Sequence, residues 1–423
     1  MAIFRPFRAV RPAAGYAEQV AQLPYDVMNS EEARVMAEDR PWDFLHVDRA
    51  EIDFPRGIDL YSDEVYAKAA ENLNFMREKG ILVEEASPCY YIYREIMNGR
   101  AQTGIVGCAS VDEYLNNTIK KHEFTVEVKE RDRIRHVDTC DANTGVIFLT
   151  MRDTAAVVKR MNEVADREDP LYDFTREDGV RHIVWRIDNP DTIALIERAF
   201  GRVPNLYIAD GHHRTASAVK VALKRRKQNP SYTGDEEFNF FLAAVFPASS
   251  LQIIDYNRVV KDLNGLSEDA FLAKLRNSFS VKPLPEPWDD SEEALEMVRP
   301  KEKHCISMLL HGKWYELKAL PSAYDPADPV RQLDVSILQE RVLTPVLNIK
   351  DPRTDGRISF VGGIRGLKEL VRLTDEGAEL AFAMYPTSME ELMNVADAGK
   401  IMPPKSTWFE PKLLSGLFIH PLS

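Results

Sequence analysis

Apolar positions along the chain switch repeatedly between helical and strand spacing, which predicts a mixed α/β protein of the α+β kind. After Ser62, apolar residues three and four positions apart begin at Val65 and end before Gly80, so we predict an amphipathic helix with Ser62 as its cap. Uninterrupted apolar runs predict two buried strands, at residues 206–209 and 240–246.

Two hairpins are predicted where turn-forming dipeptides separate strand-like runs. Asn98-Gly99 interrupts the run across 90–107, and His311-Gly312 interrupts the run across 304–317. Glycine and asparagine tolerate the positive φ angles that such turns require. Helical patterns account for three further predicted elements: after Ser267, across 330–342 and across 389–398.

The 423 residues are more than one modest core requires, and we divide them into an N-terminal region (1–85), a core (86–262) and a C-terminal α/β region (263–423). The chain has 54 Lys and Arg against 67 Asp and Glu, a net charge of −13, which argues against a nucleic-acid partner. Four scattered cysteines and the lack of a bilayer-length apolar run predict a cytoplasmic protein with no membrane partner. The sequence does not indicate an oligomeric state.

The sharpest chemical signal is Asp210-Gly211-His212-His213-Arg214-Thr215, at the junction of a predicted strand and helix. Gly211 permits a tight turn, and the free N–H groups at a helix start suit a phosphate. Arg214 is suited to grip phosphate oxygens, and Asp210 to hold Mg²⁺ together with substrate phosphates. A capped helix with two surface histidines is the alternative. Zinc is disfavoured, because adjacent histidines rarely face one metal and no second His/Cys cluster accompanies them.

Two other segments gather polar side chains. His122-Glu123 is a candidate acid/base pair, although a solvated charged face explains it equally well and no second histidine completes a zinc-protease motif. Lys405-Ser406-Thr407 follows two prolines and offers donors for a carboxylate or phosphate. Its spacing is not that of a P-loop, and taken alone it is explained more simply as a rigid C-terminal loop.

Together these segments resemble those of the ParB/sulfiredoxin-like superfamily. Asp210–Arg214 resembles its D-G-H-x-R segment, without the cysteine that sulfiredoxin uses. Among its members the free-serine kinases are the most similar. Three of their segments have counterparts here in the same order: Lys121–Glu123, Ala209–Arg214 and Gly399–Thr407. Over nearly its full length, from Pro24-Tyr25-Asp26 to the Pro-Pro-Lys-Ser-Thr end, the chain also resembles the DUF1015 family.

This resemblance implies a ParB/sulfiredoxin-like nucleotide-binding core with added N-terminal and C-terminal α/β regions. It implies a free L-serine kinase that uses ATP or ADP with Mg²⁺ to make O-phospho-L-serine. The implied roles are these: Glu123 as general base, His122 beside it, Asp210 on the metal, residues 211–215 on the nucleotide, and Lys405, Ser406 and Thr407 on the serine carboxylate. A nucleotide-binding switch protein without kinase activity remains the alternative, and a nuclease a weaker one.

Overall fold

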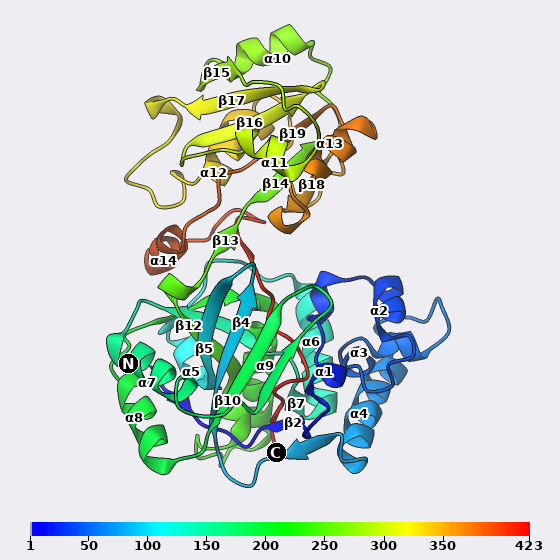
Figure 1. The fold of residues 1–423 in the computed structure, drawn as a ribbon, viewed down its shortest axis with the longest axis vertical. Coiled ribbons are helices and arrows are strands. Elements are labelled where there is room, and N and C mark those ends of the chain that lie inside the picture. Colours follow the sequence, from blue (N-terminus) through cyan, green and yellow to red (C-terminus); the bar gives the residue numbers. More distant parts are fainter. Residues whose placement is uncertain (1) are drawn as a thin grey trace. The chain divides into compact units, whose positions relative to one another are not determined.

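The computed structural model describes residues 2–423, which form two compact units (Figure 1). The first unit runs up to Leu251 and also includes Pro411–Ser423, and the second is Gln252–Glu410. The sequence sets apart an N-terminal region, residues 1–85, and its described part, residues 2–85, lies in the first unit together with residues 86–251.

The first unit is built on a nine-stranded mixed sheet with the order β6-β11-β8-β12-β5-β4-β10-β9, in which β1 also pairs with β5. Only the β6/β11 and β8/β12 pairs are parallel. Its strands are β1 Phe4–Arg5, β4 Tyr90–Met97, β5 Arg100–Ser110, β6 Ile119–Lys120, β8 Ile147–Met151, β9 Tyr172–Thr175, β10 Arg181–Ile187, β11 Leu206–Asp210 and β12 Phe240–Pro247. Two small antiparallel pairs accompany it: β2 Val10–Pro12 with β3 Leu82–Glu84, and β7 Ala142–Asn143 with β21 His420–Pro421.

The strands predicted from apolar runs in this unit are confirmed. β4 and β5 form the predicted hairpin, and its turn residues Asn98 and Gly99 have φ angles of 52° and 77°. Both angles are positive, as a two-residue hairpin turn requires. Every residue of β12 is buried, because neighbouring strands and helices cover both faces of this strand.

Helices of the first unit complete its core. They are α1 Ala17–Val20, α2 Ser30–Ala37, α3 Leu45–Asp48, α4 Asp63–Glu78, α5 Val111–Leu115, α6 Glu127–Cys140, α7 Ala155–Ala165, α8 Pro190–Phe200 and α9 His212–Gln228. Apolar side chains of α7, α8 and α9 pack in one cluster with those of the large sheet. The predicted helix α4 is confirmed, but the Ser62 hydroxyl makes no capping hydrogen bond, so its predicted capping role is wrong.

The second unit contains a separate six-stranded sheet that is antiparallel throughout, with the order β15-β17-β16-β19-β14-β18. The predicted hairpin is confirmed as β16 and β17, and its turn residues His311 and Gly312 have φ angles of 47° and 78°. The strands of this unit are β13 Ile253–Ile254, β14 Tyr256–Val260, β15 Phe279–Pro283, β16 Cys305–Leu310, β17 Lys313–Ala319, β18 Ile358–Gly362, β19 Leu380–Ala383 and β20 Trp408–Phe409.

The helices of the second unit are α10 Glu268–Leu275, α11 Glu292–Leu295, α12 Asp334–Leu338, α13 Lys368–Asp375 and α14 Met389–Asp397. The helix predicted after Ser267 is confirmed as α10, and the Ser267 side chain caps it by accepting from the Ala270 N–H. The helix predicted across 330–342 begins later, at Asp334, and continues as a π-helical turn over Gln339–Leu343. The Asp328 carboxylate accepts from the N–H groups of Val330 and Arg331, and this local turn delays the helix.

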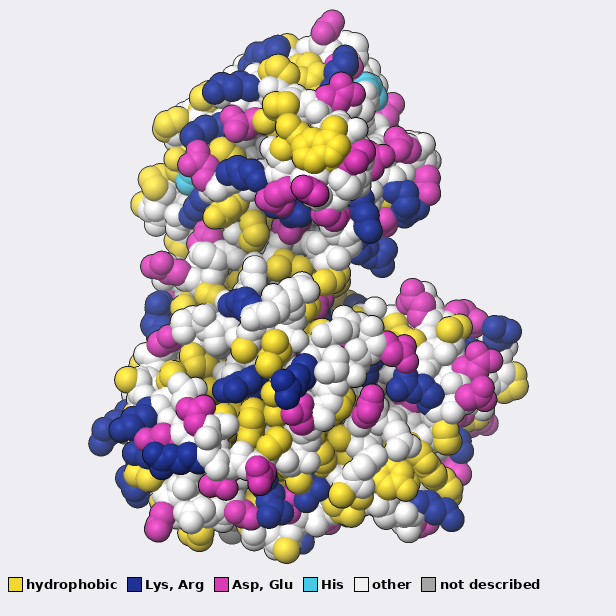
Figure 2. Space-filling model, viewed as in Figure 1, with side chains coloured by type: hydrophobic (Ala, Val, Ile, Leu, Met, Phe, Trp, Pro, Cys, Tyr) yellow, Lys and Arg dark blue, Asp and Glu magenta, His cyan; other side chains and the backbone are white. Residues whose placement is uncertain are grey.

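The overall prediction of a mixed α/β protein is confirmed by these two sheets and their helices. No helix among residues 2–423 combines the length and the apolar character that crossing a membrane requires. On the face visible in Figure 2, basic and acidic side chains are interspersed rather than separated into regions of one sign. All four cysteines are buried and unpaired.

Candidate functional site

Strand pairing brings two of the predicted segments together in the first unit. β6 lies parallel to β11, with Ile119 opposite Leu206 and Lys120 opposite Tyr207. Because parallel strands end at the same edge of a sheet, His122-Glu123 after β6 meets Asp210-Gly211 at the end of β11. Gly211 has a φ of 92° and is the residue from which helix α9 starts. A left-handed turn of this kind favours glycine.

Two buried histidines pack against each other at this edge, and one of them, His212, lies beside the Glu123 carboxylate. The rings of His122 and His212 are nearly perpendicular, with their centroids 4.5 Å apart. Burial lowers the pKa of His122 to about 4, and burial followed by the neighbouring His122 lowers the pKa of His212 well below its ordinary value. Both rings are therefore neutral at pH 7. Nδ1 of His212 lies 3.6 Å from Oε2 of Glu123, whose side chain is 46% exposed, so the carboxylate is accessible from solvent.

Asp210 sits between the backbone turn and two cations. Its Oδ1 accepts from the Gly211 N–H at 3.0 Å, and its Oδ2 lies 3.3 Å from Nζ of Lys412 and 3.8 Å from Nη2 of Arg214. Burial would raise the pKa of Asp210, but Lys412 and Arg214 outweigh it and the pKa is lowered. The carboxylate is therefore ionised across the physiological range.

The donor set at Asp210 bears on the Mg²⁺ prediction. Among the described residues 2–423, no group of three or more His, Cys, Asp or Glu side chains is arranged to hold a metal ion. Magnesium in nucleotide sites commonly uses one or two carboxylates together with substrate phosphates and water. A single ionised carboxylate at Asp210 fits that use, whereas it does not fit a closed, all-protein metal site.

Arg214 is anchored more firmly than its predicted role on phosphate requires. Its side chain is 11% exposed, and Nη1 donates to the Val146 carbonyl at 2.7 Å. A Cβ placed on Gly211 would come within 3.2 Å of the Arg214 Nε, and one on Gly145 within 3.2 Å of its Cδ. The guanidinium therefore braces the turn between β11 and α9, and phosphate binding by this side chain stays a prediction.

The remaining residues of the segment make local contacts. Nε2 of His213 accepts from the Val126 N–H at 3.0 Å, which places the ring proton on Nδ1. Burial, followed by Lys129, lowers the pKa of His213. The Thr215 hydroxyl is buried and donates to the Gly211 carbonyl at 3.0 Å, so it closes the first turn of α9.

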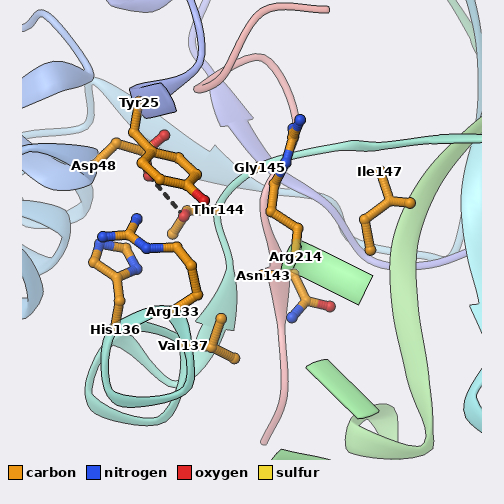
Figure 3. Close-up of a pocket in the computed structure, with 10 residues that line it drawn as sticks. All are labelled: Tyr25, Asp48, Arg133, His136, Val137, Asn143, Thr144, Gly145, Ile147 and Arg214. Atoms are coloured by element: carbon orange, nitrogen blue, oxygen red, sulfur yellow. Dashed lines mark hydrogen bonds between the residues drawn. The ribbon is translucent and has the colours of Figure 1, made fainter. Parts of the chain in front are cut away.

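The N-terminal region adds residues that sequence reasoning left without a role. Burial alone would lower the pKa of Arg214, but Asp26 followed by Asp210 raises it, so Asp26 is an acidic neighbour of the turn. Tyr25 and Arg133 form one side of a small cavity and Arg214 the other (Figure 3), with the Arg133 guanidinium 4.0 Å from the Tyr25 ring centroid. The cavity is about 20 Å³, room for roughly one water molecule. It is a support behind the turn and not a nucleotide pocket.

Two of these additions had a signal in the sequence. Pro24-Tyr25-Asp26 belongs to the segments that carry the family resemblance. Lys412 is the lone charge in the mostly apolar stretch 411–419, and a lone charge in such a stretch indicates a specific partner. The structure supplies that partner, Asp210.

The third predicted segment lies in the second unit. Lys405 has a φ of 58°, and the Ser406 hydroxyl is turned into its own loop, where it donates to the Pro403 carbonyl at 2.6 Å. The Thr387 hydroxyl donates to the Ser406 carbonyl at 2.9 Å. The Thr407 side chain makes no hydrogen bond to another described residue. Of the predicted ligand donors, Lys405 and Thr407 therefore remain available, whereas the Ser406 hydroxyl proton is already in use.

The first unit is thus a mixed α/β fold with a polar strand-to-helix turn at one edge of its sheet. The chain belongs to the family described as "Protein of unknown function (DUF1015)", whose sequence model matches residues 4–336. That match confirms the expected family. It ends before the Pro403–Thr407 segment, so the resemblance expected for that segment lies outside the matched range. A comparison with curated proteins found no match.

Several solved structures share a distant likeness with the chain. A free serine kinase in complex with AMP has 14% identity and a TM-score of 0.33, over 72% of this chain and 86% of that one. A variant of free serine kinase in complex with ADP has 13% identity and a TM-score of 0.34, over 73% and 88%. A conserved hypothetical protein from Pyrococcus furiosus has 13% identity and a TM-score of 0.33, over 74% and 94%. Likenesses at this level assign no activity to the chain.

Proposed function

We propose that this protein is a free L-serine kinase that transfers a phosphoryl group from ATP or ADP to the serine hydroxyl. The observation that carries the proposal is the Glu123 carboxylate, half-exposed and 3.6 Å from a buried neutral imidazole, next to the glycine turn that opens α9. The motif order that resembles the free-serine kinases supports the same assignment, and we assign the ParB/sulfiredoxin-like core that this resemblance implies to the first unit.

Glu123 is assigned the role of general base. A serine hydroxyl is scarcely ionised at neutral pH, so a carboxylate must accept its proton as the oxygen–phosphorus bond forms. The bond between the transferred phosphorus and the bridging oxygen breaks, and the nucleotide leaves one phosphate shorter. His212 is neutral and Glu123 is accessible, so the carboxylate is suited to meet an acceptor hydroxyl.

The glycine turn is assigned to the nucleotide. N–H groups at the start of α9 and the positive end of its dipole suit a phosphate, and Gly211 leaves room for close approach. Asp210 would hold Mg²⁺, which neutralises phosphate charge when bound. Lys412 and Arg214 hold the Asp210 carboxylate ionised for that purpose. By the same resemblance, the serine carboxylate is assigned to Lys405, Ser406 and Thr407, with Ser406 contributing through its backbone.

The experiment is an incubation of the purified protein with Mg²⁺, L-serine and either ATP or ADP, followed by mass spectrometry for O-phospho-L-serine. Product that requires both serine and nucleotide supports the kinase and names the donor. Nucleotide that is bound or hydrolysed without phosphoserine rejects the kinase and favours the nucleotide-binding switch. A parallel series with other small hydroxy-amines tests whether serine is the preferred acceptor.

A further inference from the structure

Arg258, on strand β14, is a buried cation with no acidic partner. It is 3% exposed, and its guanidinium donates to two backbone carbonyls, those of Tyr256 and of Lys405, the latter at 2.9 Å. Throughout residues 2–423, no carboxylate forms an ion pair with it. Burial of an arginine ordinarily comes with a carboxylate, because an uncompensated charge inside a protein is costly.

Comparison with other buried arginines shows that this lack of a partner is specific to Arg258. In the first unit, Nε of Arg133 lies 2.9 Å from Asp132, and Arg214 lies 3.8 Å from Asp210. Besides its two carbonyls, the Arg258 guanidinium contacts the Phe360 ring, 5.3 Å from the ring centroid, and a buried positive charge without a carboxylate favours an anion supplied from outside the chain. The position of Arg258 under the Lys405–Thr407 loop indicates where that anion binds.

The loop above Arg258 is held in a conformation that lysine rarely adopts. Lys405 has a φ of 58°, in the left-handed region, which costs a residue with a Cβ energy and persists only where surrounding contacts enforce it. The hydrogen bond from Arg258 to the Lys405 carbonyl is one such contact, and the bond from Thr387 to the next carbonyl is another. Strained residues of this kind are concentrated at ligand sites.

Lys405 adds a second positive charge to the same place. Its side chain is exposed, its Nζ lies 5.5 Å from the Tyr256 ring centroid, and within the part of the chain that the structure describes it has no ion pair. Two cations therefore flank Tyr256 without a carboxylate to neutralise them. Such a pair is complementary to a small anion.

We propose that Arg258 is the positioning residue that makes the Lys405–Thr407 loop selective for an acceptor bearing a carboxylate. The proposal rests on the proposed function and deepens it. Lys405 contacts the carboxylate, while Arg258 fixes the Lys405 backbone and supplies the buried charge beneath it. A nucleotide phosphate shares this anion chemistry, so the test includes an arm for each ligand.

The test compares L-serine with ethanolamine, which is serine without its carboxylate, in wild type, Arg258→Met and Arg258→Lys. We expect Arg258→Met to raise the KM for L-serine at least tenfold while leaving the KM for ethanolamine and the Kd for the nucleotide unchanged. Arg258→Lys should restore most of the selectivity, because it keeps the charge. Arg365→Met, at an exposed arginine of the same unit that pairs with Glu369, is the matched control and should change nothing.

If Arg258→Met raised the KM for L-serine and the KM for ethanolamine by the same factor, Arg258 would have only a structural role. A raised nucleotide Kd with an unchanged serine KM would assign the anion to the phosphate instead. If Arg258→Met does not fold, Lys405→Met at the exposed lysine must show the same loss of selectivity, and unchanged selectivity in that variant overturns the proposal.

A failure of the kinase assignment can be distinguished from a failure of the proposal for Arg258. If the wild type makes no phosphoserine, calorimetric titration with L-serine and with inorganic phosphate still compares wild type and Arg258→Met. Weaker serine binding in the variant retains the carboxylate site without the kinase. Equal binding of both ligands by both proteins overturns the inference.

Discussion

The two units handle buried charge in opposite ways. At the polar turn of the first unit, the cations Arg214 and Lys412 face the Asp210 carboxylate, and Asp26 is a second acidic neighbour of Arg214, so the site is balanced before any ligand arrives. Beside the Lys405 loop of the second unit, Arg258 faces two backbone carbonyls and the Phe360 ring, and no carboxylate among residues 2–423 pairs with it. A balanced site fixes geometry and protonation state, which suits chemistry. An unbalanced one attracts an ion of the missing sign, which suits capture of a ligand.

The largest effect is expected at the reacting carboxylate of the balanced site. Glu123→Gln keeps the shape of the side chain but removes the proton acceptor, so phosphoserine formation should fall by about 10²- to 10⁴-fold. Nucleotide affinity, measured by calorimetry, should stay within a factor of two. Glu127→Gln changes an exposed glutamate on the first turn of α6 and is the control. Turnover at the wild-type rate in Glu123→Gln would remove this residue from the base role.

The stability of the two units is expected to respond to pH in opposite directions. Burial lowers the pKa of His122 from 6.5 to about 4, so between these values the folded first unit binds fewer protons than the unfolded chain and loses stability as the pH falls. Burial raises the pKa of Asp334 from 3.8 to about 7, so the folded second unit binds more protons in that window and loses stability as the pH rises. Each group contributes up to about 1.4 kcal/mol per pH unit.

Amide hydrogen exchange, corrected for intrinsic rates, measures this response separately in each unit at pH 4.5 and pH 7. Asp334→Asn should flatten the response of the second unit alone, because the amide oxygen still accepts from the His304 N–H and no longer titrates. His122→Asn should reduce the response of the first unit alone. If either variant changed the exchange of the other unit, or neither changed its own, the assignment of these groups would be wrong.

Asp210→Asn converts the balanced site into an unbalanced one like that of the second unit. With Mg²⁺ present, nucleotide affinity should fall roughly ten- to hundredfold, because an interaction with a charged group worth about 1.5–3 kcal/mol is lost. With the metal chelated, affinity should instead equal or exceed that of wild type, because Lys412 and Arg214 are released toward the phosphates. Asp191→Asn, on the exposed first turn of α8, is the control. A loss of equal size with and without Mg²⁺ would reject the metal role.

The difference between the units also shows how much of the structure can be predicted from the sequence. Local signals predicted the hairpin at Asn98-Gly99 and the turn at Gly211, because the positive φ angles that these turns need restrict the choice of residue. The delayed start of α12 was missed because one side chain, that of Asp328, accepts from two backbone N–H groups and so competes with the helix. The pairing of Lys412 with Asp210 and the lack of a carboxylate beside Arg258 lay beyond sequence reasoning. Lys412 is 202 residues from Asp210 along the chain, so no local sequence pattern links the two. The lack of a carboxylate beside Arg258 depends on how the folded chain packs, which a sequence pattern does not show.

The smallest effects separate the two reasons why glycine occupies the turn of the balanced site. An alanine at position 211 would have an unfavourable φ of 92°, and its Cβ would lie 3.2 Å from the Arg214 Nε. Gly80→Ala has only the positive φ of 70° against it, with open space around the new methyl group. Gly145→Ala has no positive φ, and its one tight contact is with Arg214, at 3.2 Å. The left-handed backbone costs about 1–2 kcal/mol. Thermal unfolding should therefore show Gly211→Ala losing more stability than either single-cause variant. A loss in Gly211→Ala no larger than that in Gly80→Ala would mean that Arg214 yields freely, and its bracing of the turn would be wrong.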